Sequence, residues 1–380
     1  MVHEHKRLRC VSVIDSLWVG GTERSLVEQS VGLVDLGVDT TIVCLRRRDR
    51  GVHEEALRRG IPVGVLPSTS LPLQVRELRS LVRSLSPDVV HCSLLRASLV
   101  ARLACVGSKV PLLNSIVNTP YVAVRFRDPA ITPWKLHLIR IVDRLTAPLV
   151  THWHAVSGEA ARSAIEHLRI PEQKVTVIRR TRDRQRLGER SGERREAARR
   201  RLGLSPDAPV LLAVGREDFQ KNHVALVRAM SDVVRSRPGA VLLIAGREGT
   251  ESERIVQTIG QLELESSVVR LGHRTDVPEL YTAADLYLTA AHWEGFSGAL
   301  LEARLSGLPT LARALPQNHE IPSRGEPLDR TVREVNGLEV LRSLEETAAV
   351  SPAELTCPDP METMQEFAQL LLDLAGRGEP

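Results

Sequence analysis

A chain of 380 residues is too long for one ordinary hydrophobic core and suits about two domains. Its hydrophobic content of 42% and its charged content of 26% are those of a soluble globular protein. The 51 basic and 47 acidic residues leave a net charge of +4, which does not call for a nucleic-acid partner.

Five cysteines are scattered along the chain without a Cys-x-x-Cys pair, so the sequence predicts neither a zinc site nor a disulfide framework. The N-terminal residues, MVHEHKRLRC, are charged and contain no apolar signal core. No apolar run approaches the ~18–20 residues that a membrane-spanning helix needs. We therefore predict a cytoplasmic protein.

Short β-branched segments alternate with longer amphipathic segments through the first half of the chain. Gly37 and Gly60 lie where the C-terminal caps of two helices are expected. The alternation predicts βαβ units around a parallel sheet. The predicted strands are 8–15, 40–45, 62–66, 88–93, 111–117 and 151–157, and the predicted helices are 22–36, 53–59, 74–85, 95–105 and 133–146.

The alternation stops between about residues 179 and 201, where arginines are dense and apolar residues are scarce. Arginine runs occur in nucleic-acid and membrane patches. Here glutamates interrupt the run, and it holds no aromatic residue for base stacking. We interpret the segment as a solvated linker helix with Glu–Arg pairs at helical spacing.

Strand–helix alternation resumes after the arginine-rich segment. The sequence therefore predicts an α/β protein with two doubly wound domains. The later predicted strands are 209–215, 240–246, 267–272, 285–290 and 309–314, and the later predicted helices are near 221–236, 251–263 and 298–306.

The stretch HWEGFSGALLEA places Glu294 and Glu302 around a Gly-Phe-Ser-Gly turn between a predicted strand and a predicted helix. Ligands of open α/β sheets bind beyond the carboxyl ends of the strands. Glu302 lies about one helical turn after Gly298, where its carboxylate can accept hydrogen bonds from a ribose diol. Glu294 precedes the turn and can bind the hydroxyls of a second sugar. The alternative is two solvent-facing glutamates near a positive helix end.

The same turn presents backbone amides. Those of Ser297, Gly298 and Ala299 would point out of the helix N-terminus, where the helix dipole helps to hold a phosphate. Gly295 and Gly298 allow the ligand to approach the backbone closely.

Two cations follow the strand predicted at 209–215. Arg216 comes directly after it and Lys221 lies at the start of the next helix, so both can reach the carboxyl-end site. Together they match the charge of a diphosphate, and each charge-assisted hydrogen bond is worth about 1.5–3 kcal/mol. Two unrelated surface cations are the alternative.

Gly20 and Gly21 form a tight turn before a predicted helix, suited to face a phosphate or a sugar ring. They do not make the G-x-G-x-x-G fingerprint of a dinucleotide fold, which disfavours a dehydrogenase. The sequence holds no D-x-D arrangement for a carboxylate-bound metal, so Arg216 and Lys221 would take the metal's place.

On these residues the chain resembles glycosyltransferase family 4, retaining enzymes of the GT-B fold. The resemblance extends to about residue 321 and rests on the E-x7-E pair Glu294–Glu302, with VGREDFQKNHVALVRAM, VLLIAGREG, the stretch from VVRLG to GLPTLA, and Glu320. In the first half GGTE, DVVHCS and HAVSGEA are similar, more weakly.

The resemblance implies two Rossmann-like domains facing across a cleft. It implies metal-independent transfer from a UDP- or GDP-sugar to a hydroxyl of a glycan, a lipid-linked or a small-molecule acceptor, with no cofactor. Arg216, Lys221 and Glu294 are then the catalytic candidates: the two cations hold the diphosphate and Glu294 holds the transferred sugar. The full donor-binding set is Gly20, Gly21, Arg216, Lys221, Arg270, Leu271, Glu294, Gly295, Phe296, Ser297, Gly298, Ala299, Leu300 and Glu302.

The resemblance also gives the domain roles. The acceptor-binding domain is placed at 1–180, the arginine-rich linker at 181–204, the donor-binding domain at 205–325 and a tail at 326–380, in which 364–375 is a candidate helix crossing back to the first domain. Residues 178–183, IRRTRD, replace the family's Pro-Asn-Gly turn, so the site is expected to be more basic here.

Several other residues have two interpretations. His91 and Asn118 are candidates for the acceptor side of the site, and a packed or capping histidine is equally compatible with His91. His152 and His154 alternate along one strand, but no third metal ligand is near, so packing is favoured. The segment 133–145 carries apolar residues and three cations, and it either covers the sheet or lies on the inner face of a membrane.

Two rival functions fit the same architecture. A nucleotide-sugar epimerase or hydrolase would convert the donor without any acceptor. A nucleotide-sugar-binding protein would bind the donor and form no product.

Overall fold

The structure is a computed structural model, and it describes residues 7–49, 51–348, 350 and 355–376. These residues form two compact units. The first unit comprises the described residues up to Tyr121, Thr132–Arg180 and those from Pro358 onward, and the second comprises Val122–Ile131 and Thr181–Cys357.

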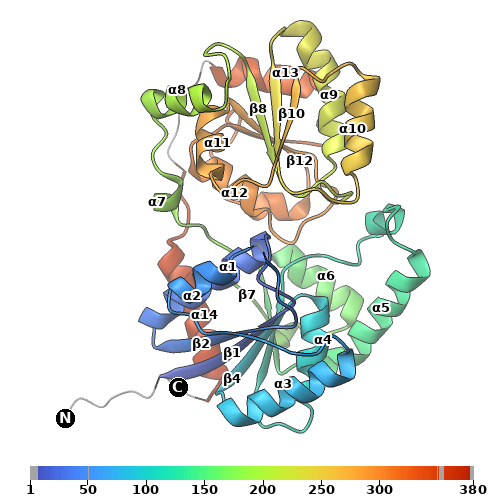
Figure 1. The fold of residues 1–380 in the computed structure, drawn as a ribbon, viewed down its shortest axis with the longest axis vertical. Helices are drawn as coiled ribbons and strands as arrows, with labels where there is room; N and C mark the ends of the chain where they lie inside the picture. The colour runs from blue at the N-terminus through green and yellow to red at the C-terminus, as the bar shows by residue number, and fades with distance from the viewer. Residues whose placement is uncertain (1–6, 50, 349, 351–354, 377–380) are drawn as a thin grey trace, which may run out of the picture. The chain divides into compact units, whose positions relative to one another are not determined.

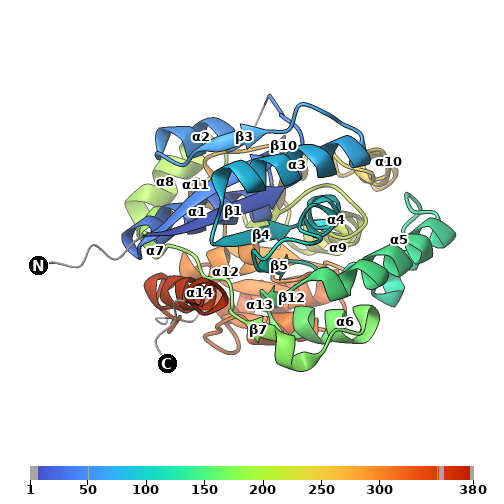
Figure 2. The ribbon, with the colours of Figure 1, turned by 90° about the horizontal axis from the view of Figure 1, so that it is seen from below.

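The first unit is built on a seven-stranded parallel sheet of order β3-β2-β1-β4-β5-β6-β7 (Figure 1). Figure 2 shows β1, β4 and β5 side by side, and the register pairs Val11 with Val90 and Val90 with Leu112. The strands are β1 Leu8–Ile14, β2 Val38–Cys44, β3 Val63–Val65, β4 Val89–Ser93, β5 Leu112–Ile116, β6 His152–Ala155 and β7 Val175–Val177. The helices are α1 Gly21–Asp35, α2 His53–Arg58, α3 Leu71–Leu85, α4 Leu95–Ala104, α5 Pro133–Thr146, α6 Gly158–Leu168 and α14 Pro360–Leu374.

The central strands of this sheet are apolar because helices cover both faces. Every residue of β1 except Arg9 is buried. Gly37 and Gly60 take φ values of +78°, as the expected helix caps require. On one face α14 inserts Phe367 and Leu371 among the apolar side chains of β1, β2, β4 and β5.

The second unit has a six-stranded parallel sheet of order β10-β9-β8-β11-β12-β13. Figure 1 shows α9 and α10 on one side of this sheet and α11 and α12 on the other. The strands are β8 Val210–Val214, β9 Val241–Ala245, β10 Val268–Gly272, β11 Leu286–Thr289, β12 Thr310–Arg313 and β13 Asp329–Val332. The helices are α7 Arg184–Leu187, α8 Gly192–Arg201, α9 His223–Ser236, α10 Ser252–Gln261, α11 Val277–Ala283, α12 Gly298–Leu305 and α13 Gly337–Ala348.

Two parallel sheets covered by helices confirm the predicted α/β class with two Rossmann-like units. The sequence patterns missed β13, which reads Asp-Arg-Thr-Val. Its polar residues are buried because they are paired: Arg324 donates to both carboxylate oxygens of Asp329, at 2.6 and 3.0 Å. A strand whose polarity is neutralised by partners elsewhere carries no apolar pattern of its own.

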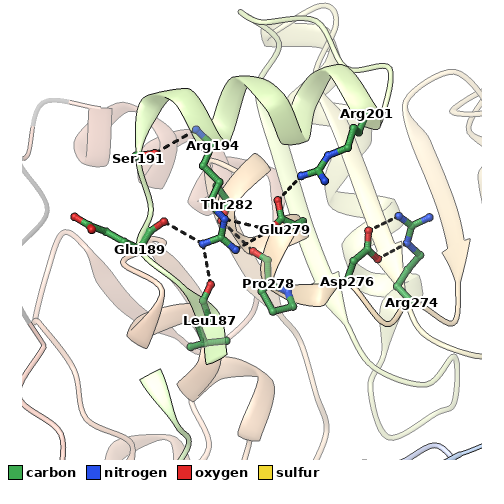
Figure 3. A network of polar contacts seen from close by, with 10 residues as sticks. All are labelled: Leu187, Glu189, Ser191, Arg194, Arg201, Arg274, Asp276, Pro278, Glu279 and Thr282. Carbon is green, nitrogen blue, oxygen red and sulfur yellow. Dashed lines mark hydrogen bonds and ion pairs between the residues drawn. The ribbon is translucent and has the colours of Figure 1, made fainter. Parts of the chain in front are cut away.

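The arginine-rich segment differs from the solvated linker that the sequence predicts. It belongs to the second unit, where Arg194 Nη2 and Arg201 Nη2 of α8 both donate to the Glu279 carboxylate of α11, at 2.8 and 2.5 Å (Figure 3). Arg199 is buried and its Nη2 lies 2.6 Å from Asp285 Oδ2. Arg194, Arg199 and Arg201 are therefore structural, with carboxylate partners nearly 80 residues or more away in the sequence, whereas the exposed Arg200 pairs with Glu196 at the helical spacing that the sequence predicts.

No helix among the described residues is both long and apolar enough to cross a membrane.

Candidate functional site

The candidate donor site lies in the second unit, where the loops after β8 and β11 meet. These two strands pair in parallel, with Leu211 opposite Leu286, so their carboxyl ends are at the same edge of the sheet. The loop after β8 carries Arg216 and Lys221, and the loop after β11 carries Glu294 and leads into α12. The His292 amide donates to Gln220 O at 2.8 Å, which ties the loops together.

Lys221 and Glu294, predicted to bind different parts of a donor, contact each other. Lys221 Nζ forms an ion pair with Glu294 Oε1, and Gln220 Nε2 donates to Glu294 Oε2 at 3.3 Å and to Trp293 O at 3.0 Å. Glu294 is buried. Lys221 lies in the turn before α9 rather than in the helix itself. This arrangement brings together the cation predicted to hold the diphosphate and the carboxylate predicted to bind the transferred sugar.

Glu302 sits one turn into α12 and has a partner on each oxygen. Arg182 Nε donates to Oε1 at 2.8 Å, and the Tyr281 hydroxyl lies 3.1 Å from Oε2. Burial and the nearby Glu302 charge raise the pKa of Tyr281 well above its ordinary value, so Tyr281 keeps its proton and donates. The Glu302 carboxylate is thus fixed in orientation, and its remaining lone pairs can accept from a diol.

The turn into α12 is largely buried. Phe296, Ser297 and Leu300 are all inaccessible, and Ser297 Oγ has no hydrogen-bond partner among the described residues. The Gly298 amide donates to Phe296 O at 3.0 Å. Of the three amides predicted to meet a phosphate, that of Gly298 is therefore already engaged within the turn.

Arg216 follows β8 and Arg270 lies on β10, with β9 between these strands, and each arginine has a carboxylate partner. Arg216 Nη2 is 3.0 Å from Asp218 Oδ2, and about half of its side chain is exposed. Arg270, on β10, donates to both oxygens of the buried Glu217 at 2.9 and 2.7 Å. The hydrogen bonds to Glu217 raise the pKa of Arg270. Leu271 follows Arg270 and is half-buried.

The candidate site residues of the first unit differ in how accessible they are to a ligand. Gly20 has an extended backbone before α1, and a Cβ there would lie 2.2 Å from Glu23 Oε2, the end of a flexible side chain; a Cβ on Gly21 would meet nothing within 4 Å. Asn118 is half-buried after β5, and its Oδ1 accepts from the Thr119 amide at 2.8 Å. His91 is buried, which favours the packed interpretation over contact with an acceptor.

His91 belongs to a buried chain of hydrogen bonds across the first sheet. Its Nδ1 lies 3.1 Å from Ser12 Oγ and its Nε2 lies 2.7 Å from Ser115 Oγ. Ser115 Oγ is 2.8 Å from His154 Nδ1, and His154 Nε2 is 3.1 Å from Ile178 O. Burial lowers the pKa of His91 to about 3 and that of His154 to about 4, so both rings are neutral near pH 7.

Among the described residues, no group of three or more His, Cys, Asp or Glu side chains is arranged to hold a metal ion. His152 instead places its Nε2 2.8 Å from Thr176 Oγ1.

Reasoning from sequence missed Arg182, Glu217, Gln220 and Tyr281. Glu217 and Gln220 lie beside the predicted cations in REDFQK, so their proximity was a usable signal. Tyr281 gave none. Arg182 lies in the segment 178–183 that is expected to make the site more basic, but its bond to Glu302, like that of Tyr281, joins distant parts of the chain.

Two family models match the chain, one at each end of it. The model of glycosyltransferase family 4 matches residues 19–186, and that of glycosyl transferases group 1 matches residues 194–334. The chain belongs to glycosyltransferase family 4. It is therefore a retaining glycosyltransferase that moves a sugar from a nucleotide sugar to an acceptor, as the sequence predicts.

Curated relatives cover most of this glycosyltransferase. It is 28% identical to D-inositol 3-phosphate glycosyltransferase of Thermobispora bispora over 332 aligned residues. The alignment covers 78% of this chain and 74% of that protein. It is 22% identical over 330 residues to UDP-Gal:alpha-D-GlcNAc-diphosphoundecaprenol alpha-1,3-galactosyltransferase of Escherichia coli, over 84% of this chain and 82% of that protein.

Solved structures agree in fold. Anabaena HepE in complex with UDP-glucose superposes with a TM-score of 0.75 at 19% identity, covering 98% of both chains. Sucrose-phosphate synthase of Thermosynechococcus elongatus gives 0.74 at 16% identity, covering 98% of this chain and 97% of that chain. These similarities confirm the GT-B fold.

Proposed function

We propose that the second unit binds a UDP-sugar at the carboxyl ends of β8 and β11 and transfers its sugar without a metal ion. The observation that carries this proposal is the Lys221–Glu294 ion pair, because Glu294 lies on the loop that leads into α12, the helix that carries Glu302. A cation and two carboxylates, the kinds of group that bind a nucleotide sugar, thus lie together at the ends of paired strands.

The donor's charges complement this pair. A diphosphate would take Lys221 from Glu294, and the hydroxyls of the transferred sugar would then occupy the Glu294 carboxylate. The diphosphate would pair with Lys221, and the sugar hydroxyls would donate hydrogen bonds to the buried Glu294 carboxylate, which matters because a buried charge without partners is strongly destabilising. Arg216, exposed beside the site, would supply the second cation by leaving Asp218.

The same cations account for catalysis. As the bond between the sugar and the diphosphate breaks, negative charge grows on the leaving phosphate. Lys221 and Arg216 stabilise that charge from fixed positions, and no reorganisation of solvent is needed. In this mechanism the acceptor oxygen bonds to the anomeric carbon on the face from which the diphosphate departs, so the configuration is retained. The departing phosphate takes the acceptor's proton, so no dedicated protein base is needed.

Two observations support uracil as the base. HepE was solved with UDP-glucose, and the E. coli relative is named for a UDP-galactose donor. In this chain the base would lie beside β10, where Arg270 is locked to Glu217 and presents a fixed edge.

A thermal-shift panel of UDP, GDP, ADP and their sugars, with and without EDTA, tests the proposal. Binding stabilises the folded protein by about 2.7 kcal/mol at a hundredfold excess over Kd. A shift selective for UDP ligands that survives EDTA supports it. A shift that EDTA abolishes contradicts the metal-free site, and a selective shift with GDP contradicts the choice of base.

A surface feature favours a lipid-linked acceptor. Helix α5 carries Trp134, Leu138, Ile141 and Leu145 at i, i+4, i+7 and i+11 spacing, which places them on one face, and all four are exposed, from 52% to 74%. Its only buried residues are Leu136 and Asp143, on the opposite face. The apolar stripe of this helix therefore faces outward.

Cations complete the pattern. Lys135 and Arg144 are exposed beside the stripe, and the single acidic residue of the helix, Asp143, is paired internally with Arg102 at 2.5 Å. An exposed apolar stripe with flanking cations fits an anionic lipid surface. We propose that α5 docks the enzyme on the inner face of a membrane, where it meets an acceptor linked to a lipid, as the name of the E. coli relative describes for that protein.

Vesicle co-sedimentation tests this docking. The wild-type protein is expected to bind phosphatidylcholine vesicles containing about one-third phosphatidylglycerol and to release them at high salt. Leu138→Gln with Ile141→Gln is expected to abolish binding. Leu57→Gln, at an exposed leucine of α2 in the same unit, is the matched control. Equal binding by the double variant and the control would contradict the role of α5.

A further inference from the structure

Arg182 reaches the donor site from the basic segment 178–183, outside the loops that follow β8 and β11. It lies before α7, is 120 residues from Glu302, and has a side chain only 6% exposed. Its Nε donates to Glu302 Oε1 at 2.8 Å and its Nη1 donates to Thr181 O at 3.1 Å. These two bonds fix the plane of the guanidinium.

The guanidinium lies against the first residue of α12. A Cβ built on Gly298 would be 2.7 Å from Arg182 Nη2 and 3.4 Å from Cζ. Gly298 is absent from the glycines with positive φ, so its backbone does not itself demand glycine. The space that Arg182 occupies accounts for the missing side chain.

This position is electrostatically unusual. The N-terminus of a helix carries partial positive charge and favours anions, so a guanidinium there is disfavoured. Glu302, one turn further along α12, offsets part of that cost. Ser297, which precedes Gly298, is 2% exposed, and its Oγ has no partner among the described residues. An anion at the N-terminus of α12 would meet both the positive helix end and the Arg182 guanidinium beside Gly298.

We propose that Arg182 is a third donor-binding cation, which binds the donor diphosphate at the N-terminus of α12 while Glu302 holds it in place. The inference rests on the proposed donor site. Arg182 would approach the diphosphate from the α12 side, whereas Lys221 and Arg216 approach it from the loop after β8. Arg182 Nε is bonded to Glu302, the carboxylate proposed to bind the ribose. Arg182 would therefore couple recognition of the ribose to recognition of the phosphates.

The test compares a nucleotide with its nucleoside. The dissociation constants of UDP and uridine are measured by NMR titration for the wild-type protein, Arg182→Ala and Arg182→Lys; GDP and guanosine replace them if the thermal-shift panel selects guanine. We expect Arg182→Ala to weaken UDP about tenfold or more and uridine less than about threefold, because one charge-assisted bond is lost. Arg182→Lys should lie between, since lysine keeps the charge without the planar fork.

Arg200→Ala is the matched control, because Arg200 is an exposed arginine on α8 whose recorded ion pair is with Glu196 on the same helix. It should leave both constants unchanged. If Arg182→Ala fails to fold, Arg182→Lys carries the comparison.

Three results would overturn the inference. Equal weakening of UDP and uridine would show that Arg182 acts only by orienting Glu302. Tighter binding of both would show that Arg182 blocks the ribose site. Unchanged binding of both would show that it has no part in donor binding. If the wild-type protein binds no nucleotide, the proposed function itself is contradicted. If the wild type binds and Arg182→Ala leaves that binding unchanged, only the role of Arg182 is contradicted.

Discussion

Lys221 Nζ and Glu294 Oε1 form an ion pair that joins two loops 73 residues apart in the sequence. The loops follow β8 and β11, which are neighbours in the sheet although β9 and β10 intervene along the chain. The pair therefore exists because of the strand order. It brings together the cation that we propose binds the phosphates and the carboxylate that we propose binds the transferred sugar.

Glu294→Gln should separate sugar recognition from nucleotide recognition. The change removes the charge that competes with the diphosphate for Lys221, so the Kd of free UDP should stay within about threefold of wild type. Transfer should fall about a hundredfold or more, since the hydrogen bonds of a buried carboxylate to the transferred sugar are weakened. Titration of UDP alongside an assay of kcat checks both. A UDP affinity that falls in parallel with kcat would contradict this division of roles.

Lys221→Met should cost stability as well as activity. It leaves the buried Glu294 carboxylate without its cation, and we expect the free energy of unfolding to fall by about 1–3 kcal/mol. Arg216→Met, at a cation about half exposed, should change it by less than about 0.5 kcal/mol. Urea denaturation measures both. The account fails here if the two variants are equally stable, because Lys221 would then not compensate a buried charge.

The strand ends were predictable from sequence, and their partners were not. Arg216, Lys221, Glu294 and Glu302 each follow a β-branched run or begin a helix, so local pattern places them at the carboxyl edge of a sheet. Arg182 has no such pattern. Its role depends on the return of a distant segment to α12, which spacing does not encode.

Pairing with distant partners also explains why sequence patterns did not predict the burial of other polar elements. The polar strand β13 is buried only because Arg324 neutralises Asp329, and the arginines of α8 are held by Glu279 and Asp285. A solvated helix and a helix tied down by distant carboxylates have the same local sequence pattern.

Arg199→Ala should reveal the structural role of the arginine-rich segment. Arg199 Nε also donates to Ala283 O in a buried hydrogen bond, and its Nη1 donates to the carbonyl oxygens of Ser205, Pro206 and Ala208, so its loss leaves one buried and three partly buried acceptors without this donor. We expect the free energy of unfolding to fall by about 2–4 kcal/mol with UDP binding unchanged. Arg200→Ala should cost less than about 0.5 kcal/mol. Comparable stability of the two variants would restore the interpretation as a solvated linker.

The buried histidine chain should make the first unit sensitive to acid. The folded-state pKa values of His91 and His154, about 3 and about 4, lie below the ordinary value of 6.5. The unfolded chain therefore binds protons that the folded one does not, and stability falls as pH drops from about 6.5 toward about 4. Each histidine lowers the free energy of unfolding by at most about 1.4 kcal/mol for each pH unit of this drop. Arg180 lies near His154 and lowers its pKa further.

Hydrogen exchange of peptides containing β4 and β6 follows this loss locally. The protection of these peptides from exchange, corrected for the intrinsic exchange rate, should decline as the pH drops from about 6.5 toward about 4. His154→Gln should reduce the slope, whereas His137→Gln, at an exposed position on α5, should retain it. A wild-type slope of zero would contradict neutral burial of the two rings.

Calorimetric titration of UDP in EDTA, into wild type and Glu302→Ala, tests the central claim most directly. The account predicts metal-free binding by the wild type and a Kd about ten to a hundred times weaker in the variant, because Glu302 loses its hydrogen bonds to the ribose diol and no longer holds Arg182. Equal affinities in the two proteins, or wild-type binding only when a divalent metal is added, would contradict the donor site described for the second unit.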